Sequence, residues 1–486
     1  MRIHCFLPYG NQETTREIVG LLACSPLVEQ IYLLTDNPEA TPIAPAHLLR
    51  TEGWGHTQTL RKIAGHAGSG YVLLYTRAER FFPGPFALER WVSVADDSRA
   101  GLAYADYYEI KKGEQHPHPV IDYQKGSLRD DFDFGPLLLY RAAALQDAVS
   151  SMDAEYVYAA LYDLRLKVSR EAPIVHINEY LYTITEDSGI TGDQQRRGEK
   201  QFDYVDPRNR TVQLEMEAAC TDHLKLVGGY LTPRFQPVRF DEASFPFEAS
   251  VIIPVRNRVR TIEDAIRSVL GQQASFPFNL IVIDNHSTDG TTEKIEQFAS
   301  DNRLIHLRPE RHDLGIGGCW NLGIHHPLCG KFAIQLDSDD VYSGPDTVQK
   351  IVDAFYTQSC AMVVGSYRMT DFHLETLPPG VIDHREWTPE NGRNNALRIN
   401  GLGAPRAFFT PVIREIGFPN TSYGEDYAVG LRISRTYAIG RIYDVLYLCR
   451  RWEDNSDAAL SQAKINGHNA YKDKIRTWEL EARIHL

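Results

Sequence analysis

The chain repeats one pattern, and this repeat constrains its fold more than any other feature. Phe6–Asn11 near the start is matched by Ile252–Asn257, and the two segments share a proline and an asparagine that are each 246 positions apart. Three further matches follow in the same order with slowly changing spacing: Leu34–Asn37 with Val282–Asn285, Gly53–Leu60 with Gly315–Leu322, and Gly84-Pro85 with Gly344-Pro345. Ordered matches of this kind indicate a duplicated structural unit. We therefore predict two units of the same fold in tandem.

The boundaries of the two units follow from the segment between them. At about 150 residues per domain, the 486 residues suggest three domains or two large ones. Thr211–Val227 has its apolar residues at helical spacing, and Gly228-Gly229 then provides a helix stop. Several prolines follow. We expect domains at 1–205 and 246–486, joined by a helical and proline-containing linker at 206–245.

Within the second unit, short apolar runs alternate with amphipathic segments. Such alternation predicts an α/β fold with a Rossmann-like, mostly parallel sheet. In these sheets, ligands bind beyond the carboxyl ends of the strands. The expected strands are Ser250–Val255, Leu280–Ile283 and Phe332–Leu336, and the expected helices are Thr261–Gln272 and Thr291–Ala299.

Charge and cysteine content exclude several classes of protein. The net charge is −13, which disfavours nonspecific binding to nucleic acid or to anionic lipid. The seven cysteines are isolated and odd in number, which favours a reducing cytoplasm over a disulfide framework. Lys464–Arg483 predicts a helix that packs on the protein, with an interfacial helix at the inner face of the membrane as the alternative.

Three carboxylates directly follow one of the buried strands. They belong to Asp337, Asp339 and Asp340, and their mutual repulsion would be relieved by a divalent cation. Mg²⁺ and Mn²⁺ prefer such oxygen ligands and often bind one or two carboxylates together with substrate phosphates. A solvated acidic turn is the alternative, but the position after a buried strand favours the metal.

Three other segments have residues suited to a nucleotide or an acceptor. Asp284 ends a strand and could accept a hydrogen bond from a base or ribose, although a turn with a helix N-cap explains the same residues. The glycine-rich loop that begins at Gly315 lets backbone approach a ligand but matches no phosphate-loop pattern. Glu425-Asp426 precedes an expected helix, so the pair either caps the helix or supplies a general base.

These motifs, taken in order, resemble a known family. Ser250–Asn257, the strand that ends in Asp284, the Asp337-Ser338-Asp339 motif and Glu425-Asp426 occur in the order found in the family 2 nucleotide-sugar glycosyltransferases, which have the GT-A fold. The resemblance covers about 249–456. Each motif is loose, and the specificity lies in the ordered set of four.

The resemblance implies a role for each matching residue. The base would bind to Asp284, and a metal that bridges the donor diphosphate, Mn²⁺ or Mg²⁺, would bind to Asp339. The general base that deprotonates the acceptor hydroxyl would be Asp426, with Glu425 beside it. The remaining residues expected to contact the nucleotide sugar are Pro254, Val255, Asn257, Asn321, Asp337 and Ser338.

The activity implied is transfer of a sugar from a nucleotide-sugar donor, in the first instance a UDP-sugar, to a glycan or lipid-linked glycan. The resemblance also implies inversion at the anomeric carbon and a place in polysaccharide or glycoconjugate biosynthesis. We expect no nucleic-acid partner. Peripheral contact with a membrane and assembly into a homo-oligomer are both left open by the sequence.

The sequence departs from the family at two points. Many relatives have an Arg-Asn pair after the glycine-rich loop, whereas this chain has Trp320-Asn321, so a nucleotide-contacting arginine is missing or replaced by stacking on the tryptophan. Many relatives also have a histidine near the metal in a segment close to the end. Glu453 stands at that position, either as an additional oxygen ligand or as a solvated loop residue.

The first unit is expected to be a degenerate copy without catalysis. In the internal alignment Thr76 and Ala78 replace Asp337 and Asp339, and Arg77 adds a positive charge at the place of the metal. Glu155-Tyr156 is aligned with the Glu425-Asp426 pair.

Two other functions remain as alternatives. One is a non-catalytic glycan-binding or scaffold protein with two inactive units. The other is a nucleotidyltransferase that makes sugar nucleotides, although the segment after the first strand of the second unit lacks the glycines of that class.

Overall fold

A computed structural model of the protein describes residues 2–185, 209–241, 244–452, 455 and 460–486. The described residues divide into two compact units. The first contains residues 2–185 together with Thr211–Tyr230 and Leu460–Leu486, and the second contains the described part of Leu231–Ala459. The second unit therefore lies in the sequence between two segments of the first.

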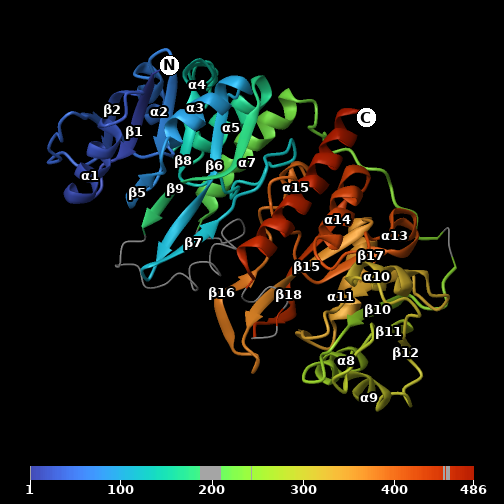
Figure 1. Ribbon diagram of the computed structural model, residues 1–486. Coiled ribbons are helices and arrows are strands. Elements are labelled where there is room, and N and C mark those ends of the chain that lie inside the picture. The colour runs from blue at the N-terminus through green and yellow to red at the C-terminus, as the bar shows by residue number, and fades with distance from the viewer. Residues whose placement is uncertain (1, 186–208, 242–243, 453–454, 456–459) are drawn as a thin grey trace. The chain divides into compact units, whose positions relative to one another are not determined.

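The first unit is built on a nine-stranded sheet with the order β3-β2-β1-β4-β8-β6-β9-β5, and β7 pairs with β6 at its side. Figure 1 shows these strands in blue to green. The elements are β1 Ile3–Pro8, α1 Gln12–Ala23, β2 Val28–Thr35, β3 His47–Arg50, α2 Thr57–Gly65, β4 Tyr71–Tyr75, β5 Arg80–Pro83, α3 Ala87–Asp97, β6 Leu102–Lys111, β7 Glu114–His118, β8 Leu137–Arg141, α4 Ala142–Ser150, α5 Ala160–Glu171 and β9 Ile174–Thr185.

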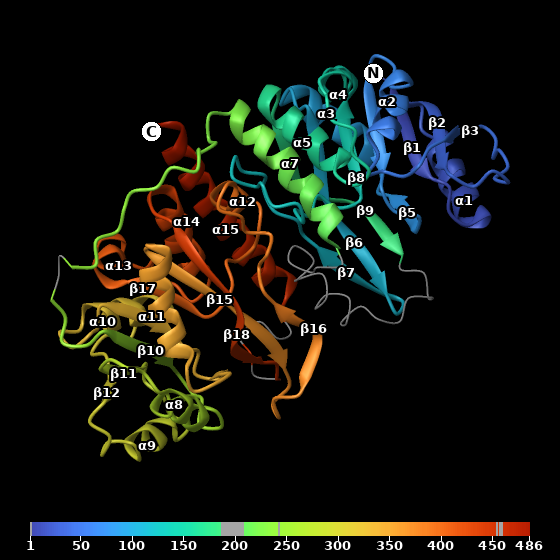
Figure 2. The same ribbon diagram turned by 180° about the vertical axis from the view of Figure 1, so that it is seen from behind.

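The second unit has a nine-stranded sheet with the order β12-β11-β10-β13-β17-β15-β18-β14, and β16 pairs with β15. Figure 2 shows this sheet from behind. The elements are β10 Ala249–Val255, α8 Ile262–Leu270, β11 Phe278–Asp284, α9 Thr291–Glu296, β12 Leu304–Leu307, α10 Ile316–His325, β13 Phe332–Gln335, β14 Val341–Tyr342, α11 Thr347–Gln358, β15 Met362–Thr370, β16 Thr376–Ile382, α12 Gly392–Asn395, β17 Arg406–Phe409, α13 Thr410–Ile416, α14 Glu425–Thr436 and β18 Ile439–Arg450.

The two sheets have the same strand order and the same strand directions. In each unit four adjacent strands run parallel, β3-β2-β1-β4 in the first and β12-β11-β10-β13 in the second. The next two pairs are antiparallel in both: β4 with β8 and β8 with β6, and β13 with β17 and β17 with β15. A long parallel pair follows, β6 with β9 and β15 with β18, with its register shift at the same place. The prediction of two tandem α/β units with one fold is confirmed. The sheets are mixed rather than mostly parallel, because the β8 and β17 strands return antiparallel beside the parallel half.

The predicted elements of the second unit form for the reasons seen in the sequence. The strands β10 and β11 are apolar runs that are buried along nearly their whole length. The helix α8 buries Ile262, Ala265, Ile266 and Val269, which lie on one face at helical spacing. The side chains of these three elements form the part of the core directly beneath the strand ends where the functional residues lie.

The helix expected in the linker belongs to the first unit. It is α7, Arg210–Leu226, and it ends before Gly228, which has a φ of 77°. Its Glu215 carboxylate accepts hydrogen bonds from the backbone N–H groups of Val157, Tyr158 and Ala159. These donors precede α5, so an acidic side chain of α7 stabilises the N-terminus of that helix.

The C-terminal helix α15, Gln462–Ile484, also packs in the first unit, although the sequence placed it with the second. Asp473 is fully buried and accepts hydrogen bonds from Ser127 and Arg476, with Arg129 at 3.4 Å. The backbone N–H of Gly126 donates to Thr477 over 3.0 Å. Pairing offsets the cost of burying these charges, so α15 can pack on the first unit although many of its residues are charged.

None of the described helices has both the length and the apolar composition needed to cross a bilayer.

Candidate active site

The loops that follow β10, β11 and β13 meet at the carboxyl edge of the second sheet. Asn257 follows β10 and accepts a hydrogen bond from the backbone N–H of Thr288, which follows β11. The hydroxyl of Thr261 donates to the backbone oxygen of Ser338, which follows β13. Asn257 has a φ of 54°, a value that asparagine tolerates better than most residues. The segments that follow these three strands, each of which contains a predicted motif, are therefore in contact.

Asp284 lies at the end of β11 and is completely buried. One of its oxygens accepts from the backbone N–H of Ser287 over 3.0 Å, and the other accepts from the Thr292 hydroxyl. Burial alone would raise the pKa of Asp284, but these hydrogen bonds outweigh it and lower the pKa below its usual value. The carboxylate thus holds the loop after β11 in shape, and the predicted contact with a base stays a prediction.

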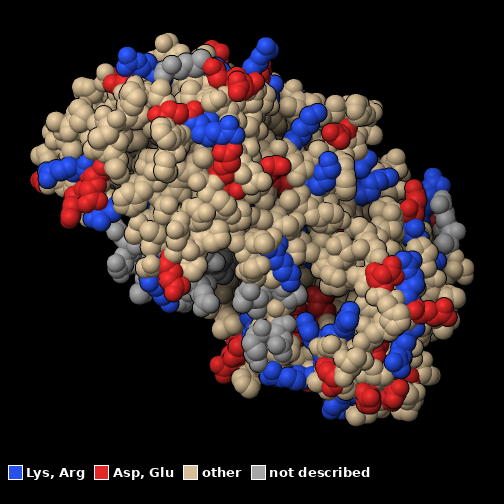
Figure 3. All heavy atoms as spheres, in the orientation of Figure 1, with Lys and Arg blue, Asp and Glu red and all other residues tan. Residues whose placement is uncertain are grey.

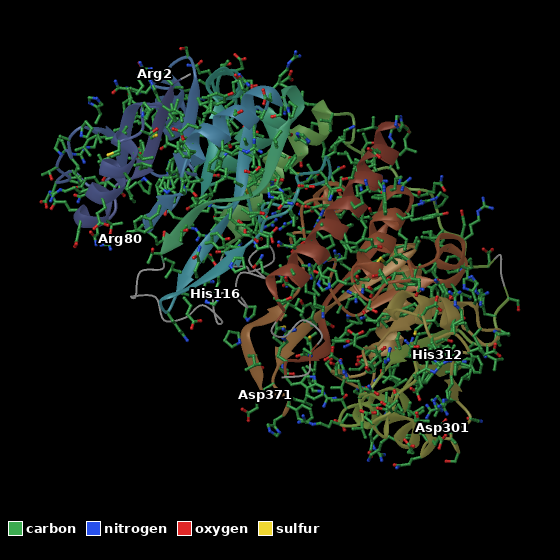
Figure 4. All side chains as sticks on the ribbon, in the orientation of Figure 1. Arg2, Arg80, His116, Asp301, His312 and Asp371 are labelled. Atoms are coloured by element: carbon green, nitrogen blue, oxygen red, sulfur yellow. The ribbon has the colours of Figure 1, made fainter. Side chains whose placement is uncertain are left out.

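Two stacked histidines lie beside this loop. His286 has a φ of 59°, and its ring stacks on that of His312 with 3.9 Å between the ring centroids. His312 comes from the segment between β12 and α10 and is labelled in Figure 4. Val255, at the end of β10, is buried, and Pro254 before it is half-buried. The loop after β11 therefore takes part in a stacked histidine pair, half-buried at His286 and exposed at His312, that the sequence did not indicate.

The acidic segment after β13 is held by β18. The backbone N–H of Asp337 donates to the Tyr447 hydroxyl over 3.1 Å. The backbone N–H of Arg450 donates to the Asp340 carboxylate over 2.7 Å, and its side chain donates to the backbone oxygen of Asp339 over 2.6 Å. Figure 3 shows acidic side chains set back in a hollow near β18, with Lys and Arg side chains beside it.

The three carboxylates do not share one environment. Asp340 is buried, and burial together with the charge of Asp339 raises its pKa well above the usual range. Burial also raises the pKa of Asp337, with Arg406 opposing the increase. The Asp339 carboxylate is about one-seventh exposed and lies 3.6 Å from the Arg258 guanidinium. Asp337 and Asp339 are thus both half-buried, whereas Asp340 is buried, and Asp339 has the Arg258 guanidinium beside it.

A chain of hydrogen bonds joins Asp337 to Asp426. The Gln335 amide donates to Asp337 over 2.9 Å, and its oxygen accepts from the backbone N–H of Arg406 over 3.1 Å. The Arg406 guanidinium then pairs with the Asp426 carboxylate at 2.7 Å. Burial would lower the pKa of Arg406, but the carboxylates of Asp426, Asp337 and Glu425 outweigh it and raise the pKa. Two residues 89 positions apart in the sequence are therefore parts of one network.

Glu425 and Asp426 begin α14 and differ strongly in burial. Glu425 is 9% exposed, and its Oε2 atom has no hydrogen-bond partner among the described residues. Burial and the neighbouring charge of Asp426 raise the pKa of Glu425 to about 8. The side chain of Asp426 is 25% exposed. At neutral pH, Glu425 is therefore mainly the neutral acid, and Asp426 is the member of the pair that a ligand can reach.

Trp320 and Asn321 lie in α10 and contact Phe418. Asn321 exchanges two hydrogen bonds with the backbone of Phe418, and the Trp320 ring stacks on the Phe418 ring and is 5% exposed. The suggestion that Trp320 replaces an arginine by stacking on a base is therefore wrong, because the ring is in the core. A Cβ on Gly317 would lie 1.9 Å from the Pro419 backbone oxygen. The glycine-rich loop serves close packing at this position.

A metal ion at this site would need ligands from substrate or water. Within the described ranges, no three or more His, Cys, Asp or Glu side chains are grouped to hold a metal. Asp337 and Asp339 fit an ion that takes one or two carboxylates and fills its other positions with phosphate oxygens and water. Glu453, the further ligand suggested by the sequence, lies outside the described residues.

The sheet registers identify the counterparts of the acids in the first unit. Tyr71 pairs with Ile3 as Phe332 pairs with Ala249, so Thr76 and Ala78 stand at the places of the two metal-site acids, as the sequence indicated. On the next strand, Leu34 pairs with Pro8 as Ile283 pairs with Pro254. The counterpart of Asp284 is therefore Thr35, and the sequence alignment with Asp36 was wrong by one residue.

The counterpart of the Glu425-Asp426 pair also differs from the sequence alignment. Both α5 and α14 have 12 residues, and each ends three residues before the strand that follows. Ala160 and Leu161 therefore occupy the two acidic positions, rather than Glu155-Tyr156. Leu138, in β8, stands at the place of Arg406. The first unit keeps the fold and lacks every charged residue of the network described above.

The sequence did not identify the basic and amide residues of the site. Gln335 and Arg406 gave no signal because each lies within or beside an ordinary apolar strand. The alternation Arg256-Asn257-Arg258-Val259-Arg260 was the one available signal, since three arginines in five residues are unusual after a buried strand.

The second unit is similar to known glycosyltransferases. The family described as Glycosyl transferase family 2 matches residues 250–409. The glycosyltransferase TuaG of Bacillus subtilis, whose name assigns it to teichuronic acid biosynthesis, is 31% identical over 121 residues, or 25% of this chain and 46% of that protein. An uncharacterized glycosyltransferase of Haemophilus influenzae is 26% identical over 163 residues, or 34% of this chain and 48% of its own. The chain thus spans just under half the length of these curated relatives.

Among solved structures, residues 1–349 of TarS from S. aureus, in complex with UDP-GlcNAc, align over 49% of this chain and 72% of that chain. The identity is 21% and the TM-score 0.38. The residues 250–409 that match the family model lie in the second unit, and they include Asp284, Asp337, Asp339 and Arg406.

Proposed function

We propose that the second unit transfers a sugar from a nucleotide-sugar donor, in the first instance a UDP-sugar, to a hydroxyl of a glycan or glycoconjugate acceptor. The observation that supports this most directly is the network that joins Asp337, Arg406 and Asp426 at the carboxyl edge of the sheet. It lies where α/β sheets bind their ligands, and two of its members, Asp337 and Arg406, are within the residues that match the glycosyltransferase family, whereas Asp426 lies after them. Because it connects the acids proposed to hold the metal with the acid proposed as the base, it supports their assignment to one site.

The leaving diphosphate would be stabilised by a divalent cation, Mn²⁺ or Mg²⁺, held by Asp339 with Asp337 beside it. Such an ion supplies positive charge where negative charge develops on the diphosphate as the sugar–phosphate bond breaks. The protein contributes the position of the two carboxylates, which Tyr447 and Arg450 fix through the backbone of the acidic segment.

Asp426 is the proposed general base. The acceptor oxygen forms a bond to the anomeric carbon, the bond from that carbon to the phosphate oxygen breaks, and the hydroxyl proton moves to the carboxylate. Arg406 at 2.7 Å compensates the charge of Asp426 and orients it. Attack from the face opposite the leaving group gives inversion. Glu425 is mainly neutral at pH 7, because its pKa is about 8, and so it does not compete for this role.

The first unit is proposed to be non-catalytic. It has Thr35, Thr76, Ala78 and Leu161 at the places of the four acids assigned above. Because it keeps the same sheet and adds α7 and α15, it is suited to a structural or acceptor-positioning role in polysaccharide or glycoconjugate assembly.

The test is a transfer assay with the full chain, Mn²⁺ and a panel of nucleotide sugars, read as release of the nucleoside diphosphate. Asp426→Asn should reduce turnover by at least about 100-fold while donor binding is kept, because general base catalysis contributes about 10²- to 10⁴-fold. Asp353→Asn, at an exposed position of α11, is the matched control. Equal turnover of both variants would refute the assignment of the base.

A further inference from the structure

Two arginines in the loop after β10 lie against two aromatic rings beside the acidic segment. The Arg260 guanidinium lies 4.8 Å from the Phe372 ring centroid and 4.9 Å from that of Trp452. The Arg258 guanidinium lies 5.9 Å from the Trp452 ring centroid. We call Arg258, Arg260, Phe372 and Trp452 the arginine–aromatic cluster. Cations that are stacked on rings in this way are held in place by the ring faces.

The cluster is in direct contact with the acid proposed to hold the metal. The Nε atom of Arg258 lies 3.6 Å from the Asp339 carboxylate, and the Trp452 indole N–H donates to the same carboxylate oxygen over 3.4 Å. The Arg450 guanidinium lies 5.5 Å from the Phe372 ring centroid and pairs with Asp264 at 2.8 Å. Arg450 is buried, whereas Arg258 is half-buried and Arg260 is exposed.

The degenerate first unit lacks this feature. There the helix α1 begins at Gln12, directly after Asn11, the counterpart of Asn257. In the second unit the helix α8 does not begin until Ile262, so an additional segment, 258–261, separates the asparagine from the helix. Both arginines of the cluster are in that segment. The first unit therefore lacks counterparts of both the two arginines and the acids.

Guanidinium groups in this position suit a diphosphate. The planar fork of arginine matches phosphate geometry and makes charge-assisted hydrogen bonds with it. A divalent cation binds carboxylate and phosphate oxygens at about 2 Å each, so phosphates bridged to Asp339 lie within about 4 Å of that carboxylate. Arg258 is already within that range of Asp339.

We propose that Arg258 and Arg260 bind the phosphates of the nucleotide-sugar donor and stabilise the diphosphate as it leaves. The proposal rests on the proposed function, because it places the donor at Asp339. It adds a second, metal-independent source of positive charge at the leaving group. The protein therefore retains measurable affinity for a nucleoside diphosphate when divalent cations are removed.

The experiment is calorimetric titration of the full chain with UDP, GDP, ADP and CDP and with the matching nucleosides, each with Mn²⁺ and with EDTA. Arg258→Gln and Arg260→Gln should each weaken binding of the diphosphate about tenfold, since a hydrogen bond to a charged group stabilises by about that factor. Binding of the nucleoside should change less than about twofold, because a nucleoside has no phosphate to contact. In EDTA, both variants should still bind the diphosphate more weakly than the wild type does.

The matched control is Arg256→Gln, which removes the same charge from the same loop at an exposed position outside the cluster. It should leave both affinities unchanged. If the two cluster variants bind the diphosphate as well as wild type, the inference is refuted. It is also refuted if diphosphate and nucleoside binding fall in the same proportion, since the arginines then hold the fold. If wild type binds none of the four diphosphates, the proposed function itself fails.

Discussion

The buried acid at the start of α14 gives a prediction about stability and pH. Glu425 is 9% exposed, and its pKa is raised from an ordinary value of 4.5 to about 8. A carboxyl group with a raised pKa in the folded state stabilises the fold while it is protonated. That stabilisation is complete below the pKa of the unfolded chain and is lost as the pH rises through the folded-state pKa. The unfolding free energy of the wild type should therefore decrease between pH 5 and pH 8.

The magnitude follows from the two pKa values. Each pH unit between them changes the unfolding free energy by at most about 1.4 kcal/mol. Because the unfolded carboxyl is still partly protonated at pH 5 and the folded one is only half ionised at pH 8, the loss over this range is about 3 kcal/mol. Glu425→Gln removes the titrating group and keeps the shape. The substitution itself changes stability by an amount that does not depend on pH. From pH 5 to pH 8, the unfolding free energy of the variant should therefore rise by about 3 kcal/mol relative to that of the wild type.

The assay is urea denaturation of both proteins at pH 5 and pH 8, followed by circular dichroism. The control is Glu296→Gln, at an exposed position of α9, which should show no such shift. If the difference between Glu425→Gln and wild type is the same at both pH values, then Glu425 is ionised in the folded protein across this range, and the reasoning from its burial is refuted.

Three further outcomes are expected. Asp339→Asn should weaken Mn²⁺-dependent binding of a nucleoside diphosphate by at least about tenfold in calorimetry, and equal Mn²⁺ dependence in variant and wild type would contradict its role. Asp473→Ala should destabilise the protein by about 3–5 kcal/mol in thermal unfolding, because it removes a fully buried carboxylate that compensates the charge of the buried Arg476, whereas the exposed Lys474→Ala should have little effect. Gly317→Ala should lower the melting temperature, because its Cβ would lie 1.9 Å from a backbone oxygen, while Gly467→Ala, with nothing within 4 Å, should not.

The internal repeat and the strand-end acids could be recognised from the sequence because each depends on local patterns. Buried strands are apolar runs, and the segments that follow them have distinctive residues, so β10, β11 and β13 were found at nearly their true positions. The repeat predicted one fold twice, and the matching strand orders confirm it. The alignment of single residues between the two units was less accurate, because an error of one residue along a strand can be detected only from the sheet register. The register shows that Thr35, not Asp36, is the counterpart of Asp284.

Long-range pairing was decided by the tertiary structure alone. Arg406 and Gln335 have no distinctive neighbours in the sequence, and only the antiparallel pairing of β17 with β13 brings them between Asp337 and Asp426. Burial is likewise a property of the folded chain, and it distinguishes a neutral Glu425 from an accessible Asp426 although the two are adjacent. The sequence determined which chemical groups stand at the strand ends, because it encodes the strands locally. The fold determined which of those groups meet, because contacts between distant residues depend on sheet register and packing.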